Sequence, residues 1–308
     1  MVDYGKIGAS GWLIIDKPRG LGSTQVVSRI KRLLREGGYN KTKVGHGGTL
    51  DPLAEGVLPI ALGEATKLAG RMLNASKTYT FTIKFGSETD TLDTEGEVIA
   101  RSSHRPPIAA ISEVLEHFTG EIEQEPPAYS ALMVDGKRAY KRARAGEAVQ
   151  LKKRSVSIHS LDLTNDREDS QLSSTFQNTS GRPDPYDPAI PLELAETVTL
   201  TTHVSKGTYI RSLARDICHS LGTLGHVIYL RRLTAGPFSE NQSISLDKLG
   251  EVANGASLFD FILPFEAGLD DIPVLRLDPE DAQAVKQGRI VSGMPQGDGL
   301  YLAKSGET

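Results

Sequence analysis

Residues 44–60 read VGHGGTLDPLAEGVLPI, a run that combines four glycines, a histidine and an aspartate with two prolines. The first three glycines are expected to take positive φ and to let the backbone approach a ligand closely. Pro52 disfavours a helical conformation for the residue before it, so Asp51 is expected at the lip of a tight loop. A carboxylate in that place can act as a nucleophile, a general base or a metal ligand. The alternative is a plain turn, for which glycine, aspartate and proline are the usual residues.

The segments on either side of this run predict an α+β sheet domain, because alternating strands are interspersed with helical patterns. Ser23 or Thr24 can cap the first helix, and Thr208 can cap a later one. Tyr79 begins a strictly alternating strand and shares one face of it with three other apolar residues. We expect strands at 11–16, 78–85 and 198–204, and helices at 25–36, 109–118, 137–146 and 210–221.

The composition is that of an ordinary globular protein, with 308 residues, 38% hydrophobic and 24% charged. This length suits one large or two smaller domains. The single cysteine, Cys218, excludes a disulfide framework and a cysteine-based zinc site, and its apolar helical surroundings predict a small core residue. The start lacks the apolar region of a signal peptide, and no apolar run is long enough to span a bilayer. We therefore expect a cytoplasmic protein without a membrane partner.

Charge is distributed unevenly along the chain, although the net charge is only −4. Residues 17–43 hold eight cations against one acid, and residues 134–154 hold eight cations against two. Residues 160–200 hold eight acids against two cations. Two basic blocks separated from the acids are typical of a track for a nucleic-acid backbone. Solvated helix faces are the alternative interpretation of the same blocks.

GHGGTLDPLAEGVLPI resembles the catalytic motif of the bacterial TruB pseudouridine synthases. Four further segments resemble the family in the same order, namely GWLIIDKPRGLGST at 11–24, SKTYTFTIKFGSETDTLDTEG at 76–96, PPAYSALMVDGKRAY at 126–140, and SKGTYIRSLARDI with GHVIYLRRL within 205–233. The resemblance implies a mixed, largely antiparallel central sheet flanked by helices. It also implies isomerisation of the uridine of the TΨC loop, position 55 of tRNA, to pseudouridine.

The resemblance assigns the nucleophile to Asp51 and an ion-pairing partner to Arg211. The residues give a separate reason to single out Arg211, because it lies in the first turn of a helix, where the macrodipole disfavours a cation. Arg211 also lies off the apolar stripe of that helix. The alternative interpretation is an exposed, solvated arginine without a functional role. Tyr79 matches the tyrosine that stacks on the target base, and its phenol could also help to move the C5 proton. The alternative interpretation is that Tyr79 only packs at the edge of the hydrophobic core.

Further site residues follow from the resemblance with less support from the residues themselves. They are His46, which helps to hold the target nucleotide out of the stack, Tyr209 and Leu230, which line the uracil pocket, Lys17, which supports the active-site loops, and Asp93, whose role stays open. From the second basic block we expect Lys137, Arg138 and Lys141 to contact the RNA backbone. No second histidine or cysteine lies at ligand spacing from His46, so we expect neither a metal nor a cofactor.

The domain organisation is predicted as a catalytic domain over 1–265 and a partial or shortened PUA-like RNA-binding segment over 270–308. The polar stretch 164–191, rich in Ser, Asp and Pro, is expected to be a flexible insertion without an assigned role. We expect a monomer that binds the T-arm stem-loop of tRNA.

Two other functions fit parts of the pattern. A tRNA-binding folding factor with secondary catalysis would use the same basic blocks, but the set of Asp51, Tyr79 and Arg211 favours an enzyme. A glycoside hydrolase would attack the same ribose carbon and would need two carboxylates about 5–10 Å apart. Residues 44–60 offer no clear second carboxylate, and free uracil would be its product.

Overall fold

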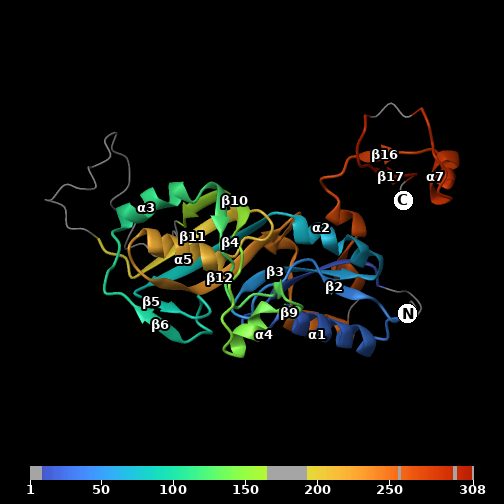
Figure 1. Cartoon of the computed structure of the whole chain (residues 1–308). Helices are drawn as coiled ribbons and strands as arrows, with labels where there is room; N and C mark the ends of the chain where they lie inside the picture. Colours follow the sequence, from blue (N-terminus) through green and yellow to red (C-terminus); the bar gives the residue numbers. More distant parts are fainter. Residues whose placement is uncertain (1–8, 165–192, 256–257, 294–296, 307–308) are drawn as a thin grey trace.

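The computed structural model describes residues 9–164, 193–255, 258–293 and 297–306. A long twisted sheet runs through the molecule, with helices packed against it and a small C-terminal segment set to one side (Figure 1). The predicted insertion at 164–191 lies almost entirely outside the described residues. The α+β class and the mixed, largely antiparallel sheet are confirmed.

The main sheet has the strand order β14-β1-β3-β12-β4-β11-β10-β7, and β2, β13 and β15 pair along its side. The pairs β1–β14 and β3–β12 are parallel, and the other pairs are antiparallel. Its strands are β1 (Gly11–Lys17), β2 (Val44–His46), β3 (Glu55–Leu62), β4 (Lys77–Phe85), β7 (Gly120–Gln124), β10 (Arg154–Leu163), β11 (Thr197–Val204), β12 (Gly225–Ala235), β13 (Phe238–Ser239), β14 (Ile244–Ser245) and β15 (Ile262–Leu263). The two-stranded pairs are β5 (Ser87–Thr89) with β6 (Val98–Arg101), β8 (Met133–Val134) with β9 (Lys137–Arg138), and β16 (Val274–Arg276) with β17 (Leu302–Lys304).

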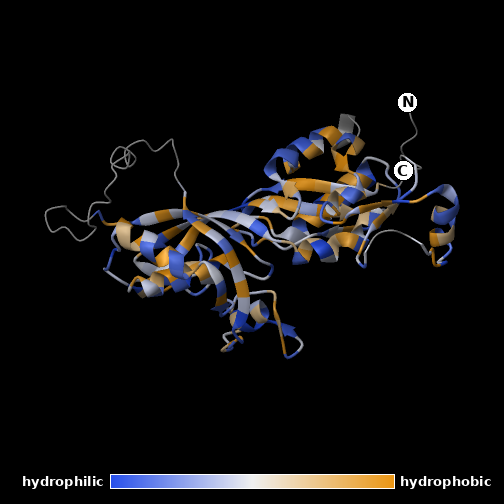
Figure 2. Ribbon diagram, turned by 90° about the horizontal axis from the view of Figure 1, so that it is seen from above, coloured by the Kyte–Doolittle hydropathy of each residue, from blue (hydrophilic) through white to orange (hydrophobic). Residues whose placement is uncertain are grey.

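The α-helices of the described chain are α1 (Ser23–Glu36), α2 (Ala69–Asn74), α3 (Ile108–His117), α4 (Ala139–Arg144), α5 (Ile210–Ser220), α6 (Leu246–Gly255) and α7 (Pro279–Lys286). Helix α5 packs on β4 and β12, and α1 packs on β2 and α6. The helical ribbons carry both polar and apolar residues (Figure 2). Across the described residues, no helix combines the length and apolarity that crossing a membrane requires.

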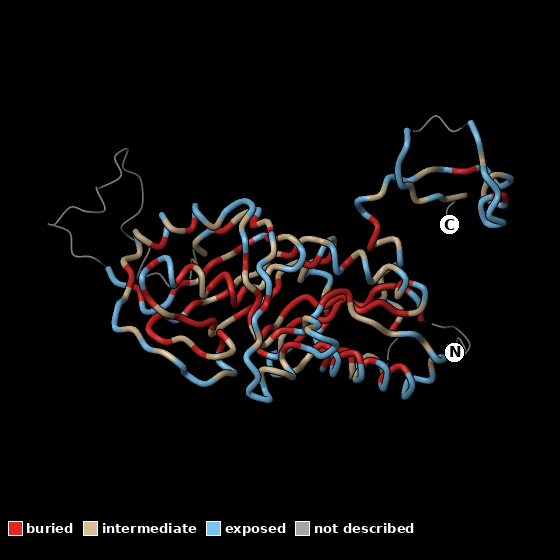
Figure 3. The backbone as a smooth tube through the Cα atoms, in the orientation of Figure 1, coloured by how far each residue is buried: buried red, intermediate tan, exposed pale blue. Residues whose placement is uncertain are grey.

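Strand β1 explains why the sheet can be covered on both faces. Leu13 and Ile15 belong to the larger core, whereas Trp12 and Ile14 belong to a smaller core on the other face. All four side chains are at most 1% exposed, as expected of a continuously apolar strand. Figure 3 shows that such buried residues concentrate in the sheet. Cys218 is fully buried, as predicted, and burial raises the pKa of its thiol to about 12.

The predicted helix caps are wrong, for a physical reason that matters for the site. The N-cap of α1 is Gly22, because the hydroxyl of Ser23 is engaged by the backbone of Leu50 instead. The N-cap of α5 is Tyr209, since the hydroxyl of Thr208 donates to the carbonyl of Ser205 at 3.1 Å. In both cases the hydroxyl that a cap would use is bonded to backbone outside the helix.

The helix predicted at 137–146 is shorter than expected. Lys137 and Arg138 form the strand β9 of a small hairpin, and the helix covers only Ala139–Arg144. Likewise, His46 ends strand β2, where it pairs with Ile60, and does not lie in a loop. Strand pairing therefore holds all three residues, of which Lys137 and Arg138 were expected on a helix.

The prediction of positive φ for the first three glycines of the 44–60 run holds only for Gly48, at +142°. Gly47 is required for a different reason, because a Cβ there would lie 2.6 Å from Cβ of Met72. Gly56 has φ +97°, and its Cβ would lie 2.3 Å from the carbonyl oxygen of Arg232 on the paired strand. Gly56 therefore allows β3 and β12 to approach each other directly after the loop that joins β2 to β3.

The C-terminal segment consists of β16, α7 and β17. Asp278 is the N-cap of helix α7, and its side chain accepts a hydrogen bond from the amide of Asp281 at 2.8 Å. Lys304 pairs with Glu266 at 3.4 Å, which ties β17 to the preceding segment. This segment is largely exposed (Figure 3), so the division into domains at 265–270 stays a prediction.

We predict that Gly56→Ala destabilises the fold by about 3 kcal/mol or more, because it combines backbone strain with a clash against a strand backbone. Gly38→Ala is the matched control, since Gly38 has φ +76° and no neighbouring atom within 4 Å of the place that a Cβ would take. Strain alone should cost that variant about 1 kcal/mol. Urea unfolding measures both, and equal losses in the two variants would contradict the close approach at Gly56.

Candidate active site

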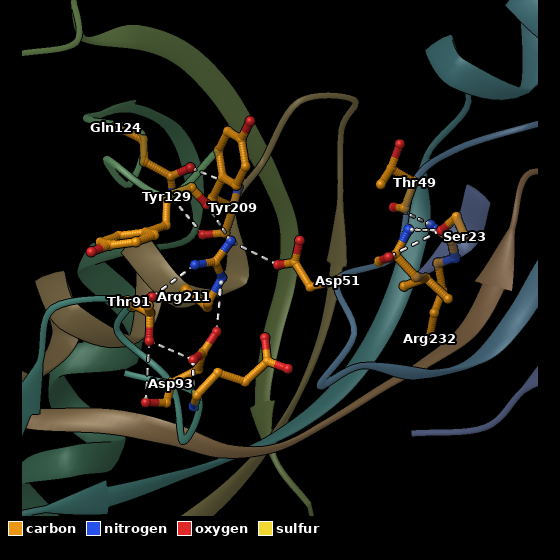
Figure 4. Close-up of polar contacts among 12 residues, drawn as sticks. Ser23, Thr49, Asp51, Thr91, Asp93, Gln124, Tyr129, Tyr209, Arg211 and Arg232 are labelled. Carbon is orange, nitrogen blue, oxygen red and sulfur yellow. Dashed lines mark hydrogen bonds and ion pairs between the residues drawn. The ribbon is translucent and has the colours of Figure 1, made fainter. Parts of the chain in front are cut away.

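Asp51 lies in the connection between β2 and β3, where its side chain is 36% exposed. Its own carbonyl accepts a hydrogen bond from the amide of Ala54 at 3.1 Å. The carboxylate points away from the loop toward α5, where it meets Arg211 (Figure 4). This is the exposed loop position that the proline at 52 predicted, and the carboxylate is free on one side to contact a ligand.

Arg211, the second residue of α5, occupies the centre of the site. Its Nη2 lies 2.8 Å from Oδ2 of Asp51 and also donates to the carbonyl of Tyr129 at 3.0 Å. Its Nη1 donates to the carbonyl of Thr91 at 2.7 Å, and its Nε lies 3.6 Å from Oδ2 of Asp93. With a side chain that is 5% exposed, the guanidinium is fixed in one orientation toward Asp51.

Asp93 anchors the other side of this arginine. Its side chain is 2% exposed, and its Oδ1 accepts hydrogen bonds from the hydroxyl of Thr91 at 2.6 Å and the amide of Glu95 at 2.9 Å. Because these bonds fix the carboxylate, Asp93 can orient Arg211 but is not free to turn toward a ligand. The sequence left this role open, and the structure places Asp93 behind the ion pair.

A cavity of about 310 Å³ opens beside Asp51. Its walls bring together five residues expected from the sequence, namely Asp51, Tyr79, Tyr209, Arg211 and Leu230. They come from the β2–β3 loop, β4, α5 with its N-cap, and β12. The volume is at the lower end of the range typical of small-molecule sites. A planar, partly apolar group of nucleobase size therefore suits this cavity.

A second cavity of about 880 Å³ adjoins the first and shares Asp51 and Arg211 with it. His46 lines this second cavity, together with the acidic residues Asp93 and Glu95. Burial, followed by the charges of Asp93 and Asp51, raises the pKa of Glu95 above its ordinary value. The fold thus supplies further carboxylates that the 44–60 run did not contain.

Lys17 lies beneath the loop, fully buried, and lines neither cavity. Its ammonium donates to the carbonyls of Leu21 at 2.6 Å, Pro18 at 3.0 Å and Pro52 at 3.4 Å. Burial lowers its pKa to about 8, although the charge of Asp51 acts in the opposite direction. The position agrees with the expected support of the active-site loops and separates Lys17 from direct substrate contact.

Arg232 takes part in the site although the sequence did not predict it. This residue is 1% exposed, and its guanidinium donates to the carbonyls of Val57 at 2.7 Å, Gly48 at 3.2 Å and Thr49 at 3.4 Å. The one signal that could have found it was a cation inside the apolar alternation of GHVIYLRRL. Arg232 holds the same loop from the side of β12.

The three cations expected on the RNA backbone, Lys137, Arg138 and Lys141, are all exposed. Arg138 lines the second cavity with Arg144 of the following helix. Arg142 is committed within the same segment, since it pairs with Asp135 at 2.9 Å and Glu147 at 2.6 Å. Residues 133–144 therefore present exposed cations at the rim of the cavity that contains His46.

We predict that the stability of the protein relative to His46→Asn falls as the pH is lowered. Burial, and then the charge of Arg232, lower the pKa of His46 below 6.5, so the unfolded chain binds the proton more readily than the folded one. The stabilising difference is complete above about pH 6.5 and is lost below it. Urea unfolding of both proteins at about pH 8 and about pH 5 measures this. A difference that grows toward low pH would show that His46 is protonated in the fold.

Two protein-family models match the chain. The model described as TruB family pseudouridylate synthase (N terminal domain) matches residues 34–182. The model described as tRNA pseudouridylate synthase B C-terminal domain matches residues 211–270. These two spans contain Asp51, Tyr79 and Arg211.

Two similar relatives are both called tRNA pseudouridine synthase B. The protein from Novosphingobium aromaticivorans is 59% identical over 96% of this chain and 90% of its own length. The protein from Zymomonas mobilis is 51% identical over 95% of this chain and 88% of its own length.

Solved structures give the same result for the fold. A Cbf5-Nop10-Gar1 complex is similar with a TM-score of 0.62 and 28% identity over 90% of this chain and 67% of its own. An H/ACA RNP bound to a substrate RNA containing 2'-deoxyuridine is similar with a TM-score of 0.64 and 25% identity over 96% of this chain and 74% of its own. The chain therefore belongs to the TruB family of tRNA-modifying pseudouridine synthases.

Proposed function

We propose that this enzyme isomerises the uridine of the TΨC loop of tRNA and that Asp51 is its nucleophile. The observation that carries the proposal is the Asp51–Arg211 ion pair at the wall of the smaller cavity. One carboxylate oxygen is held at 2.8 Å by a buried guanidinium, while the side chain remains 36% exposed. A carboxylate that is fixed, charged and accessible on one side is what covalent catalysis requires.

The reaction breaks the bond between N1 of uracil and C1′ of ribose, rotates the base, and joins C5 to C1′. The proton on C5 is lost and N1 gains one, so no atom is added or removed overall. Attack by Asp51 on C1′ or on C6 holds one fragment covalently and divides this change into smaller steps. In either route Arg211 stabilises the attacking carboxylate and keeps its orientation through Asp93.

The base is proposed to occupy the smaller cavity. Tyr79, on β4, offers an aromatic face for stacking, as base-flipping sites do. Leu230 lies on the neighbouring strand β12, and Tyr209 precedes α5, so both would enclose the ring from other sides. The phenol of Tyr79 is then our candidate for assisting the transfer of the C5 proton. His46, in the adjoining cavity, would contact the nucleotides next to the flipped one.

The rest of the tRNA is proposed to run past the larger cavity. The exposed cations of the 133–144 hairpin and helix would contact its phosphates, and the segment 270–308 would add a further contact.

We predict that Asp51→Asn abolishes pseudouridine formation, because the amide keeps the shape but is a poor nucleophile. A residue that acted only as a general base would contribute about 10²–10⁴-fold and leave measurable activity. RNA affinity should stay within a few-fold, since phosphate contacts dominate it. The measurement is chemical mapping of pseudouridine in an unmodified T-arm stem-loop.

A thermal melt controls for folding, because Arg211 loses its ionic partner in this variant. A folded Asp51→Asn protein that still forms pseudouridine at a substantial rate would refute the nucleophile. A binding and folding factor would show no multiple turnover in the wild type, and release of free uracil would instead indicate a glycoside hydrolase. In that case Glu95, whose pKa is raised above its ordinary value, would be the second carboxylate that a glycoside hydrolase needs.

We predict that replacing Lys137, Arg138 and Lys141 by Ala weakens binding to all RNA sequences. The slope of log affinity against log salt should fall by about one for each phosphate that the variant can no longer neutralise. The single-turnover rate at saturating enzyme should change little, because these side chains do not touch the smaller cavity. Filter binding at several salt concentrations measures the slope.

The control carries Ala at Lys84 and Arg101, two exposed cations of β4 and β6. It should keep the wild-type slope. If the triple variant also keeps it, the 133–144 segment does not face the RNA.

A further inference from the structure

Two buried polar side chains outside the reaction chemistry form the same unusual contact. Each closes a ring of two hydrogen bonds on the N–H and C=O of a single distant residue (Figure 4). Ser23 does this on Leu50, the residue before Asp51. Gln124 does this on Tyr209, two residues before Arg211.

The Ser23 contact fixes the backbone on one side of Asp51. Its Oγ accepts from the amide of Leu50 at 2.8 Å and donates to the carbonyl of Leu50 at 3.0 Å. On the other side, the carbonyl of Pro52 accepts from the amide of Gly20 at 2.7 Å. Ser23 is 3% exposed, so water does not compete for these bonds. Asp51 is thereby held between two anchored neighbours.

The Gln124 contact fixes the start of α5. Its Oε1 accepts from the amide of Tyr209 at 2.8 Å, and its Nε2 donates to the carbonyl of Tyr209 at 3.1 Å. Arg154, its partner on the paired strand β10, covers the ring of Tyr209 with its guanidinium carbon 4.8 Å from the ring centroid. Gln124 is completely buried. Tyr209 and the following helical turn, which carries Arg211, are therefore held against the end of β7.

We infer that Ser23 and Gln124 are positioning residues that jointly set the geometry of the Asp51–Arg211 ion pair. One fixes the backbone that carries the carboxylate, and the other fixes the backbone that carries the guanidinium. Ion-pair alignment at 2.8 Å depends on both backbones, because aspartate has only a short reach from its Cα and the carbonyls of Thr91 and Tyr129 hold the longer arginine side chain in one orientation. The inference rests on the proposed role of Asp51.

The test is a double-mutant cycle with Ser23→Ala and Gln124→Met, assayed on the unmodified T-arm stem-loop. Each single variant should lower kcat by about 10- to 100-fold, as a small misplacement of catalytic groups does, and leave the Kd for RNA unchanged. The double variant should lose little more than the worse single variant, because both act through one ion pair. Unfolding free energies should nevertheless add, since the two contacts share no partner.

Ser28→Ala and Gln242→Met are the matched controls. The hydroxyl of Ser28 donates to the carbonyl of Thr24 on the exposed side of α1, and Gln242 accepts from the amide of Ser239 at the surface. Both controls should keep the wild-type kcat. If Gln124→Met does not fold, Gln124→Glu replaces it, because it keeps the acceptor for Tyr209 and loses only the donor.

Losses of kcat that multiply in the double variant would overturn the inference, because they show independent structural damage. Single variants with wild-type kcat, or with the loss confined to RNA affinity, would overturn it as well. Asp51→Asn in the same assay distinguishes a failure of the proposed nucleophile from a failure of the positioning role. Activity in that variant refutes the nucleophile, whereas inactivity there beside unaffected Ser23 and Gln124 variants refutes only the positioning role.

Discussion

The buried guanidinium of Arg211 is the interaction on which the rest of the site depends. It joins the loop that carries Asp51, the segment that carries Asp93 and the carbonyls of Thr91 and Tyr129. A cation at 5% exposure is tolerable only because anionic and carbonyl oxygens surround it. The same arrangement holds the carboxylate of Asp51 at the wall of the smaller cavity, so one contact joins four separate segments of the fold and the proposed site.

Around this pair, buried cations fix the backbone of the loop that joins β2 to β3, residues 47–54. Arg232 holds the carbonyls of Gly48 and Thr49, and Lys17 reaches the carbonyl of Pro52. Lysine and arginine have several donors each, so one side chain can satisfy carbonyls that no strand partner reaches. Burial lowers the pKa of Lys17 to about 8, because the interior of the protein disfavours its charge. The loop is thus rigid for electrostatic reasons, although it has no regular secondary structure.

The sequence predicted the elements well and the polar contacts poorly. Alternation found β4, and helical spacing found α1 and α5, because burial of an apolar face is a local pattern. Asp51 and Arg211 were found through their motifs and their unusual positions. The sequence pattern predicts a helix-capping role for the hydroxyl of Ser23 and gives no sign of the contact that Gln124 makes. Their partners lie 27 and 85 residues away, so no spacing along the chain could indicate them.

The measurement that tests the central role of Arg211 most directly is the single-turnover rate of Arg211→Lys on the unmodified T-arm stem-loop. Lysine keeps the charge, but its ammonium lacks the planar arrangement of donors with which the guanidinium contacts Asp51, Asp93 and two carbonyls at the same time. We predict a folded protein that binds the RNA with nearly wild-type affinity and forms pseudouridine at least about 100-fold more slowly. A rate within a few-fold of the wild type would contradict the dependence of the site on this guanidinium.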